Sequence, residues 1–204
     1  MNLIFDLDGT LIDSRMRLYQ LFKTLVPRAK LSFEEYWHFK SNKVSNEAIL
    51  AQEFGFDRAQ IDQFKSEWMS KIEAPKFLAF DQNFPFMHET LEYLKKEATL
   101  YVCTARQTRK PVIDQLKQLD ILSYFEDIMV TEQRTNKVEL ISHIAGLESQ
   151  DWIIGDTGLD IQVGKALGIK TCAVLTGFLS AASLREYMPD LIIDCATDFR
   201  TPIN

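Results

Sequence analysis

The chain has 204 residues, enough for one well-buried α/β core or for such a core with a small inserted domain. Its hydrophobic content of 46% and charged content of 25% are typical of a soluble globular protein. The net charge of −6, with no block of lysines and arginines, argues against nucleic acid or an anionic membrane as the main partner.

The first stretch of the chain combines a predicted strand with two carboxylates. The apolar run 3–5 has the content of a buried strand, and Asp6, Asp8 and Gly9 follow it. Alternate side chains of a strand share a face, and a glycine permits a sharp turn. Two carboxylates that lie so close repel each other and need a counter-cation, which points to a hard metal with oxygen ligands. A strand that simply ends in an Asp-Gly turn is the alternative interpretation.

Helical patterns occupy residues 14–80, and nothing there reads as a strand–helix–strand unit. Their ends are marked by known start and stop residues: Pro27 after the first helix, capping boxes at Ser32/Glu35 and Asp57/Gln60, and Gly55 after the helix through 48–50. We therefore predict a small helical domain of residues 14–80, inserted into an α/β core made of residues 1–13 and 81–204.

From residue 81 onward, strand and helix patterns alternate. The predicted strands cover 99–104, 127–130, 152–154, 170–175 and 191–193, and the predicted helices lie near 87–94, 112–119, 136–144, 161–167 and 181–187. Such alternation predicts a doubly wound, Rossmann-like parallel sheet, which binds ligands at the carboxyl ends of its strands.

Polar residues stand at the ends of four of these units. Asp6 and Asp8 follow the first strand, Thr104 ends the second, Lys137 opens the helix after the third, and Asp156 follows the fourth. In a doubly wound sheet these positions converge on one crevice. Three carboxylates suit Mg²⁺, a hydroxyl beside free backbone N–H groups suits phosphate, and a lysine near a helix start suits an anion. Taken singly, each residue also has an ordinary interpretation as a turn, capping or surface residue.

These residues give the chain a strong resemblance to the haloacid dehalogenase-like hydrolases, in the phosphoglycolate phosphatase-like subgroup with a helical cap. Asp-Leu-Asp-Gly-Thr at 6–10 matches the first motif of that family, and Gly-Asp-Thr-Gly-Leu-Asp at 155–160 matches the fourth. Thr104 and Lys137 match the second and third motifs. The chain departs from the family at Ala105 and Arg106, where Asn or Ser and then Lys or Asn are common, and at Val138, where proline is common.

The resemblance implies a Mg²⁺-dependent phosphatase that acts on a small phosphorylated metabolite, phosphoglycolate-like or a sugar phosphate. Asp6 would be the nucleophile that forms an aspartyl-phosphate, and Asp8 the general acid and base. The side chains of Asp6 and Asp156 and the backbone carbonyl of Asp8 would bind Mg²⁺. Asp160 would orient Lys137 from behind. Relatives that cleave carbon–halogen or carbon–phosphorus bonds lack the second aspartate, so Asp8 argues against both reactions.

The expected phosphate-binding residues are Asp6, Gly9, Thr104, Ala105, Arg106 and Lys137. Substrate specificity is expected from the cap, near the polar loop 42–45, with Lys43 as the candidate residue.

Two alternatives come from other functional classes. One is a phosphosugar mutase similar to β-phosphoglucomutase, which would use the same two aspartates. The other is a phosphate-binding module without catalysis, because a fold alone does not fix a function. The sequence leaves the substrate and the oligomeric state open.

The three cysteines, Cys103, Cys172 and Cys195, lie scattered in apolar runs. We expect reduced thiols in a cytoplasmic protein, and neither a disulfide framework nor a zinc site. The N-terminus lacks the pattern of a signal peptide, and no apolar run is long enough to span a bilayer.

Overall fold

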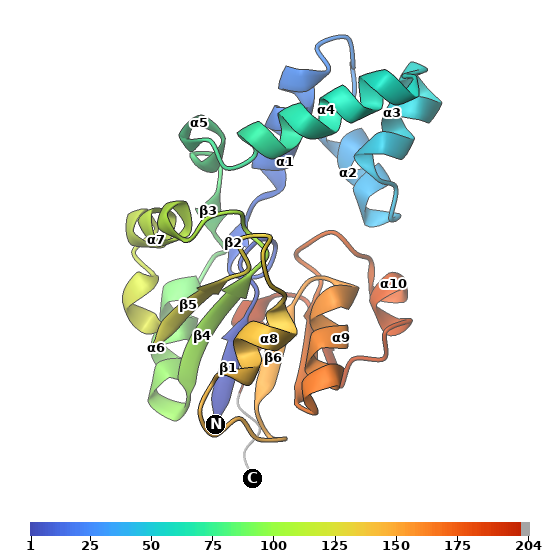
Figure 1. Cartoon of the computed structure of the whole chain (residues 1–204). Coiled ribbons are helices and arrows are strands. Elements are labelled where there is room, and N and C mark those ends of the chain that lie inside the picture. Colours follow the sequence, from blue (N-terminus) through green and yellow to red (C-terminus); the bar gives the residue numbers. More distant parts are fainter. Residues whose placement is uncertain (201–204) are drawn as a thin grey trace.

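A six-stranded parallel sheet runs through the structure, a computed structural model that describes residues 1–200, and its strand order is β5-β4-β1-β6-β7-β8 (Figure 1). The strands of this sheet are β1 (Asn2–Phe5), β4 (Thr99–Thr104), β5 (Asp127–Val130), β6 (Trp152–Gly155), β7 (Lys170–Val174) and β8 (Leu191–Ile193). The predicted doubly wound α/β fold is thereby confirmed.

Helices cover both faces of the sheet, so its strands are apolar on both sides. On one face, Leu3 and Phe5 of β1 pack in the cluster that includes α6 (Met87–Glu97) and α7 (Arg109–Gln118). On the other face, Ile4 packs with α8 (Lys137–Ser142) and α9 (Gly158–Leu167), and α10 (Ala181–Arg185) follows β7. Two short 3₁₀ helices complete the core: η1 (Leu122–Tyr124) and η2 (Ala196–Asp198).

The segment that carries α1 to α5 is helical, as predicted, and lies beyond the carboxyl ends of the strands of the six-stranded sheet (Figure 1). We call its helices the cap helices: α1 (Arg15–Leu25), α2 (Phe33–Ser41), α3 (Asn46–Phe54), α4 (Arg58–Lys71) and α5 (Pro75–Leu78). Helices α1 to α4 enclose an aromatic cluster of their own, in which Phe22 contacts both Tyr36 and Phe64. Both predicted capping boxes are present, at Ser32 and Asp57.

A two-stranded antiparallel ribbon joins the cap helices to the core. It pairs β2 (Ile12–Asp13) with β3 (Gln82–Asn83), at the two borders of the predicted helical insertion. Strands of two residues carry no readable periodicity, so the sequence does not predict this ribbon. The assignment of residues 14–80 to a separate domain stays a prediction.

Several predicted boundaries differ from the structure by a few residues. The helix expected to open near Pro111 begins at Arg109, and the helices expected to reach 144 and 187 end at Ser142 and Arg185. Asn136 caps α8 as predicted, but the Glu139 carboxylate accepts a hydrogen bond from Thr135 and does not close a capping box. Within residues 1–200, no helix is long and apolar enough to cross a membrane.

Candidate active site

The position of β1 in the sheet determines where the site forms. Its neighbours are β4 on one side and β6 on the other, so the chain connections diverge at its carboxyl end and leave a crevice there. A cavity of about 290 Å³ occupies this crevice. It is lined from the core by Asp6, Asp8, Thr104, Ala105, Arg106, Gln107, Gln133, Lys137, Asp156, Thr157, Leu159, Asp160 and Phe178, and from the cap side by Ser14, Arg17, Leu18, Met69, Ile72 and Glu73.

A buried acidic cluster lines this cavity. Carboxylate oxygens of Asp6, Asp156 and Asp160 lie within 4.8 Å of one another. Lys137 joins two of the three, because its Nζ lies 2.7 Å from Oδ1 of Asp6 and 2.6 Å from Oδ1 of Asp160. Its side chain is only 5% exposed, which excludes an ordinary surface lysine.

This cluster holds more negative charge than its lysine balances. Burial raises the pKa of Asp6 and of Asp156 above the usual range, against the opposing charge of Lys137. Burial alone would lower the pKa of Lys137, but the carboxylates of Asp160 and Asp6 outweigh it and raise that pKa. A further cation would relieve the remaining repulsion among the carboxylates.

Asp156 is held by the turn after β7. Its Oδ2 accepts a hydrogen bond from the backbone N–H of Phe178 at 3.0 Å, whereas its buried Oδ1 has no hydrogen-bond partner within residues 1–200. A Cβ on Gly177 would lie 1.7 Å from Oδ2 of Asp156, so this approach requires a glycine. Gly9 also lies against Asp156, with a positive φ of 79°.

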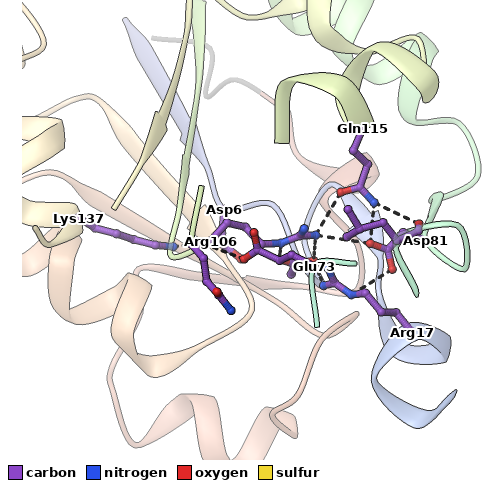
Figure 2. A network of polar contacts seen from close by, with 10 residues as sticks. Asp6, Arg17, Glu73, Asp81, Arg106, Gln115 and Lys137 are labelled. Carbon is purple, nitrogen blue, oxygen red and sulfur yellow. Dashed lines mark hydrogen bonds and ion pairs between the residues drawn. The ribbon is translucent and has the colours of Figure 1, made fainter. Parts of the chain in front are cut away.

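Asp8 also lines the cavity and lies between two arginines. Arg106 contacts both of its carboxylate oxygens, with Nε 2.5 Å from Oδ2 and Nη2 2.7 Å from Oδ1. Nη2 of Arg17, from α1, also donates to Oδ1. Burial would raise the pKa of Asp8, but the adjacent guanidinium groups of Arg106 and Arg17 hold it well below its usual range. Figure 2 shows these polar contacts, with Lys137 at one end of the group of side chains and Arg17 at the other.

The structure brings together most of the residues that the sequence singled out. Asp6, Asp8, Thr104, Ala105, Arg106, Lys137, Asp156 and Asp160 all line the one cavity. Gly9 does not line it and instead makes room for Asp156. The guanidinium of Arg106, expected to bind phosphate, is occupied by Asp8, Gln115 and Asp81.

Lys43 lies apart from the other candidate residues. It does not line the cavity, and its Nζ lies 2.7 Å from an Oε of Glu186, just after α10. Its ammonium also lies 5.5 Å from the ring centroid of Tyr187. In this arrangement Lys43 connects the loop after α2 with the core, and its role in substrate specificity stays a prediction.

Among the residues that hold the carboxylates and Arg106 of the site in place, the sequence analysis missed Arg17, Asp81, Gln115 and Gly177. Arg17 had a readable signal, because it stands four residues before Leu21 on the buried face of a predicted helix, where an arginine needs a partner. Asp81, Gln115 and Gly177 had none, since their partners are distant in sequence.

Comparisons with known proteins show which family the chain resembles in sequence and fold. The family model for haloacid dehalogenase-like hydrolases matches residues 3–174. A phosphoglycolate phosphatase of Aquifex aeolicus is 27% identical, over 96% of this chain and 93% of that protein. A solved hydrolase of the haloacid dehalogenase-like family from Streptococcus pneumoniae is 28% identical, with a TM-score of 0.76 over 94% of this chain and 92% of that one. A structure from Thermotoga maritima described as a β-phosphoglucomutase is 18% identical, with a TM-score of 0.69 over 96% of this chain and 94% of that one. At this level of identity, the similarity shows only that the two chains share a fold.

Proposed function

The chain belongs to the haloacid dehalogenase-like hydrolases and is a phosphatase of the phosphoglycolate phosphatase-like kind, and we propose that it hydrolyses a small phosphomonoester with Mg²⁺ through an aspartyl-phosphate on Asp6. The observation that carries the proposal is the position of Asp6. Its carboxylate lines the cavity, directly after the central strand, and one of its oxygens lies 2.7 Å from the Lys137 ammonium. That ammonium would also stabilise charge on a transferring phosphoryl group.

The residues around Asp6 fit a bound Mg²⁺. Asp156 offers a buried oxygen that no other group in the described part of the chain satisfies, and the donors are carboxylates, which Mg²⁺ prefers. The side chains of Asp6 and Asp156, with the backbone carbonyl of Asp8, would hold the ion. When bound, it would reduce the repulsion between the Asp6 carboxylate and the phosphate dianion.

The proposed reaction has two steps. A carboxylate oxygen of Asp6 bonds to phosphorus while the bond from phosphorus to the ester oxygen breaks, and Asp8 gives a proton to the leaving oxygen. Asp8 then takes a proton from water as the water oxygen attacks phosphorus, which frees Asp6 and releases phosphate. The arginines beside Asp8 favour its carboxylate, which is the form that remains after the proton transfer of the first step and the form that the second step requires. Thr104 would hold a phosphoryl oxygen from the end of β4.

The proposed substrates are small. A cavity of about 290 Å³ that the cap helices partly cover suits a metabolite better than a folded phosphoprotein. Phosphoglycolate is the first compound to test, because the relative from Aquifex aeolicus is named a phosphoglycolate phosphatase. A phosphosugar mutase is the alternative, since it would use the same two aspartates.

The test is a panel of small phosphorylated metabolites with purified protein, with Mg²⁺ or with a chelator, measuring released phosphate. We expect Mg²⁺-dependent release by the wild type and none by Asp6→Asn, because an amide is a poor nucleophile and a poor ligand for Mg²⁺. With a sugar 1-phosphate, isomerisation without release of phosphate would favour the mutase. Near-normal turnover by Asp6→Asn would refute the covalent mechanism, and no turnover of any compound would favour a binding module.

A further inference from the structure

Behind Arg106 lies a pair of buried polar side chains that do not line the cavity. Gln115 projects from α7, and Asp81 follows α5, near the ribbon strand β3. Gln115 Oε1 accepts a hydrogen bond from Arg106 Nη2 at 3.2 Å, and Gln115 Nε2 donates to Oδ2 of Asp81 at 2.7 Å. The Asp81 carboxylate also lies 3.4 Å from Nη2 of Arg106 and 3.4 Å from Nε of Arg17 (Figure 2).

The amide of Gln115 meets a demand that few side chains satisfy. It must accept from a guanidinium and donate to a carboxylate at once, and an amide carries one group of each kind. A carboxylate at this position would face Asp81, and an apolar side chain would remove one hydrogen bond from each of the two partners. The network therefore fixes the rotamer of Arg106 from behind, while Arg106 holds both oxygens of Asp8 in front.

Stability alone does not account for such a network. Buried ion pairs are often no more stabilising than well-packed apolar residues of similar volume, because the charges lose their hydration. What the network supplies is a fixed direction for a long side chain whose rotamers would otherwise vary. Catalytic groups gain rate when supporting contacts hold them in a productive geometry.

We propose that Gln115 and Asp81 are positioning residues, which act through Arg106 to orient the Asp8 carboxylate toward the water that releases the phosphoryl group from Asp6. This inference rests on the function proposed above. It concerns the second step, in which Asp8 takes a proton from water, the water oxygen bonds to phosphorus, and the bond from phosphorus to Asp6 breaks.

The test uses p-nitrophenyl phosphate, whose acidic leaving group departs without the proton of Asp8. With this substrate, kcat/KM reports the steps up to the phosphoenzyme, whereas kcat also includes its hydrolysis. We expect Gln115→Met to lower kcat and KM together, each about tenfold, a part of the 10²–10⁴-fold that proton transfer typically contributes. The acid-quenched variant should carry a phosphoryl group, visible as added mass in the intact protein.

Two further variants keep the test independent of folding defects. Asp81→Asn has nearly the same shape as the native residue and should show the same paired fall in kcat and KM. Gln118→Met makes the same chemical change at an exposed position of α7 and should leave both constants unchanged. Loss of folded protein lowers kcat without changing KM, so the fall in KM separates misorientation from unfolding.

Asp8→Asn is the reference, and it should accumulate the phosphoenzyme most strongly. If it accumulates none, the proposed role of Asp8 is wrong and the positioning inference fails with it. If Asp8→Asn accumulates phosphoenzyme but Gln115→Met and Asp81→Asn do not, the proposed function stands and the positioning inference alone is overturned. An increase of kcat in either variant would also overturn it, because the network would then restrain Asp8.

Discussion

Among single residues, Lys137 is a buried charge whose loss should affect both stability and turnover. Its ammonium lies between Asp6 and Asp160 and is nearly inaccessible to water. Breaking a buried ion pair strands the remaining charges, which typically costs about 3–5 kcal/mol of the free energy of unfolding. Removing one preorganised donor that stabilises a developing negative charge, as in an oxyanion hole, typically lowers kcat by about 10²–10³-fold.

We therefore predict that Lys137→Met loses both stability and activity. Urea unfolding should detect the first effect, and phosphate release under saturating Mg²⁺ the second. Added Mg²⁺ should restore part of the stability, because it would bind the stranded carboxylates under the proposed function, but it should not restore the rate. Lys137→Arg should not restore the rate either, because a planar guanidinium does not replace a compact ammonium. Near-normal turnover by Lys137→Met would contradict the assignment.

Gly177 gives a second prediction at this scale. An alanine Cβ there would overlap Oδ2 of Asp156, so Gly177→Ala should displace a proposed Mg²⁺ ligand. We expect the affinity for Mg²⁺ to fall by about tenfold or more, as for other losses of support around a metal site. Titration calorimetry with Mg²⁺ measures this without substrate. Gly55→Ala is the control, because no atom lies near its Cβ position and its effect should be confined to stability. Equal Mg²⁺ affinity in Gly177→Ala and the wild type would exclude Asp156 as a ligand.

The sequence predicted the residues near strand ends that line the cavity and, apart from Asp160, missed those that support them. Asp6, Thr104, Lys137 and Asp156 were readable because a parallel sheet brings the carboxyl ends of its strands to one edge. No spacing rule connects Gln115 with Asp81, which lie 34 positions apart on elements that meet only after folding. Local sequence patterns reveal side chains whose positions follow from the strands. Tertiary packing determines which side chains from distant parts of the sequence support them.

At the scale of elements, start and stop residues determined most boundaries in the cap helices. Both capping boxes and the helix end at Gly55 were predicted, because each depends on contacts within a few residues. The early start of α7 was not, since Thr108 precedes it without a side-chain cap. Local hydrogen bonds can be read from the sequence, and ends set by tertiary packing cannot.

The box at Asp57 supports a prediction about α4. Asp57 Oδ1 accepts from the backbone N–H of Gln60 at 2.9 Å, so Asp57→Ala should lower the free energy of unfolding by about 1 kcal/mol. Kinetic constants should not change, because the residues near the cavity stand at the other end of this helix. Asp62→Ala, an exposed position within α4, is the control and should not destabilise the helix. Urea denaturation of the three proteins measures the difference, and equal midpoints would show that the box does not stabilise α4.

At the scale of the whole molecule, the cap helices contact the core beside the cavity. Trp37 of α2 stacks on Phe178, with ring centroids 5.5 Å apart and an interplanar angle of 26°. Phe178 lines the cavity, and its backbone N–H donates to Asp156. The pair of Lys43 and Glu186 forms a second, exposed contact between the same two parts. A cap residue thus touches the segment that supports the proposed metal site.

This contact predicts how the cap contributes to substrate binding. If closure of the cap helices over a bound phosphomonoester needs the stacked rings, Trp37→Ala should weaken the closed state by about 0.5–1.5 kcal/mol, the usual contribution of an aromatic pair. An equilibrium that favours closure less must weaken apparent substrate binding in proportion. We therefore expect KM for a small phosphomonoester to rise by about 2- to 10-fold, a factor that follows from the same energy.

Trp68 provides the matched control for this last variant. It is half-buried like Trp37, but its ring packs within the cap helices, 5.5 Å from Phe64, and not against the core. Trp68→Ala should therefore lower the melting temperature and leave KM unchanged, whereas Trp37→Ala should raise KM at temperatures where both proteins are folded. Steady-state kinetics beside thermal unfolding distinguish the two effects. If KM rises equally in both variants, the effect comes from a general loss of packing in the cap helices. If KM is unchanged in Trp37→Ala, substrate binding does not depend on the contact between α2 and the core.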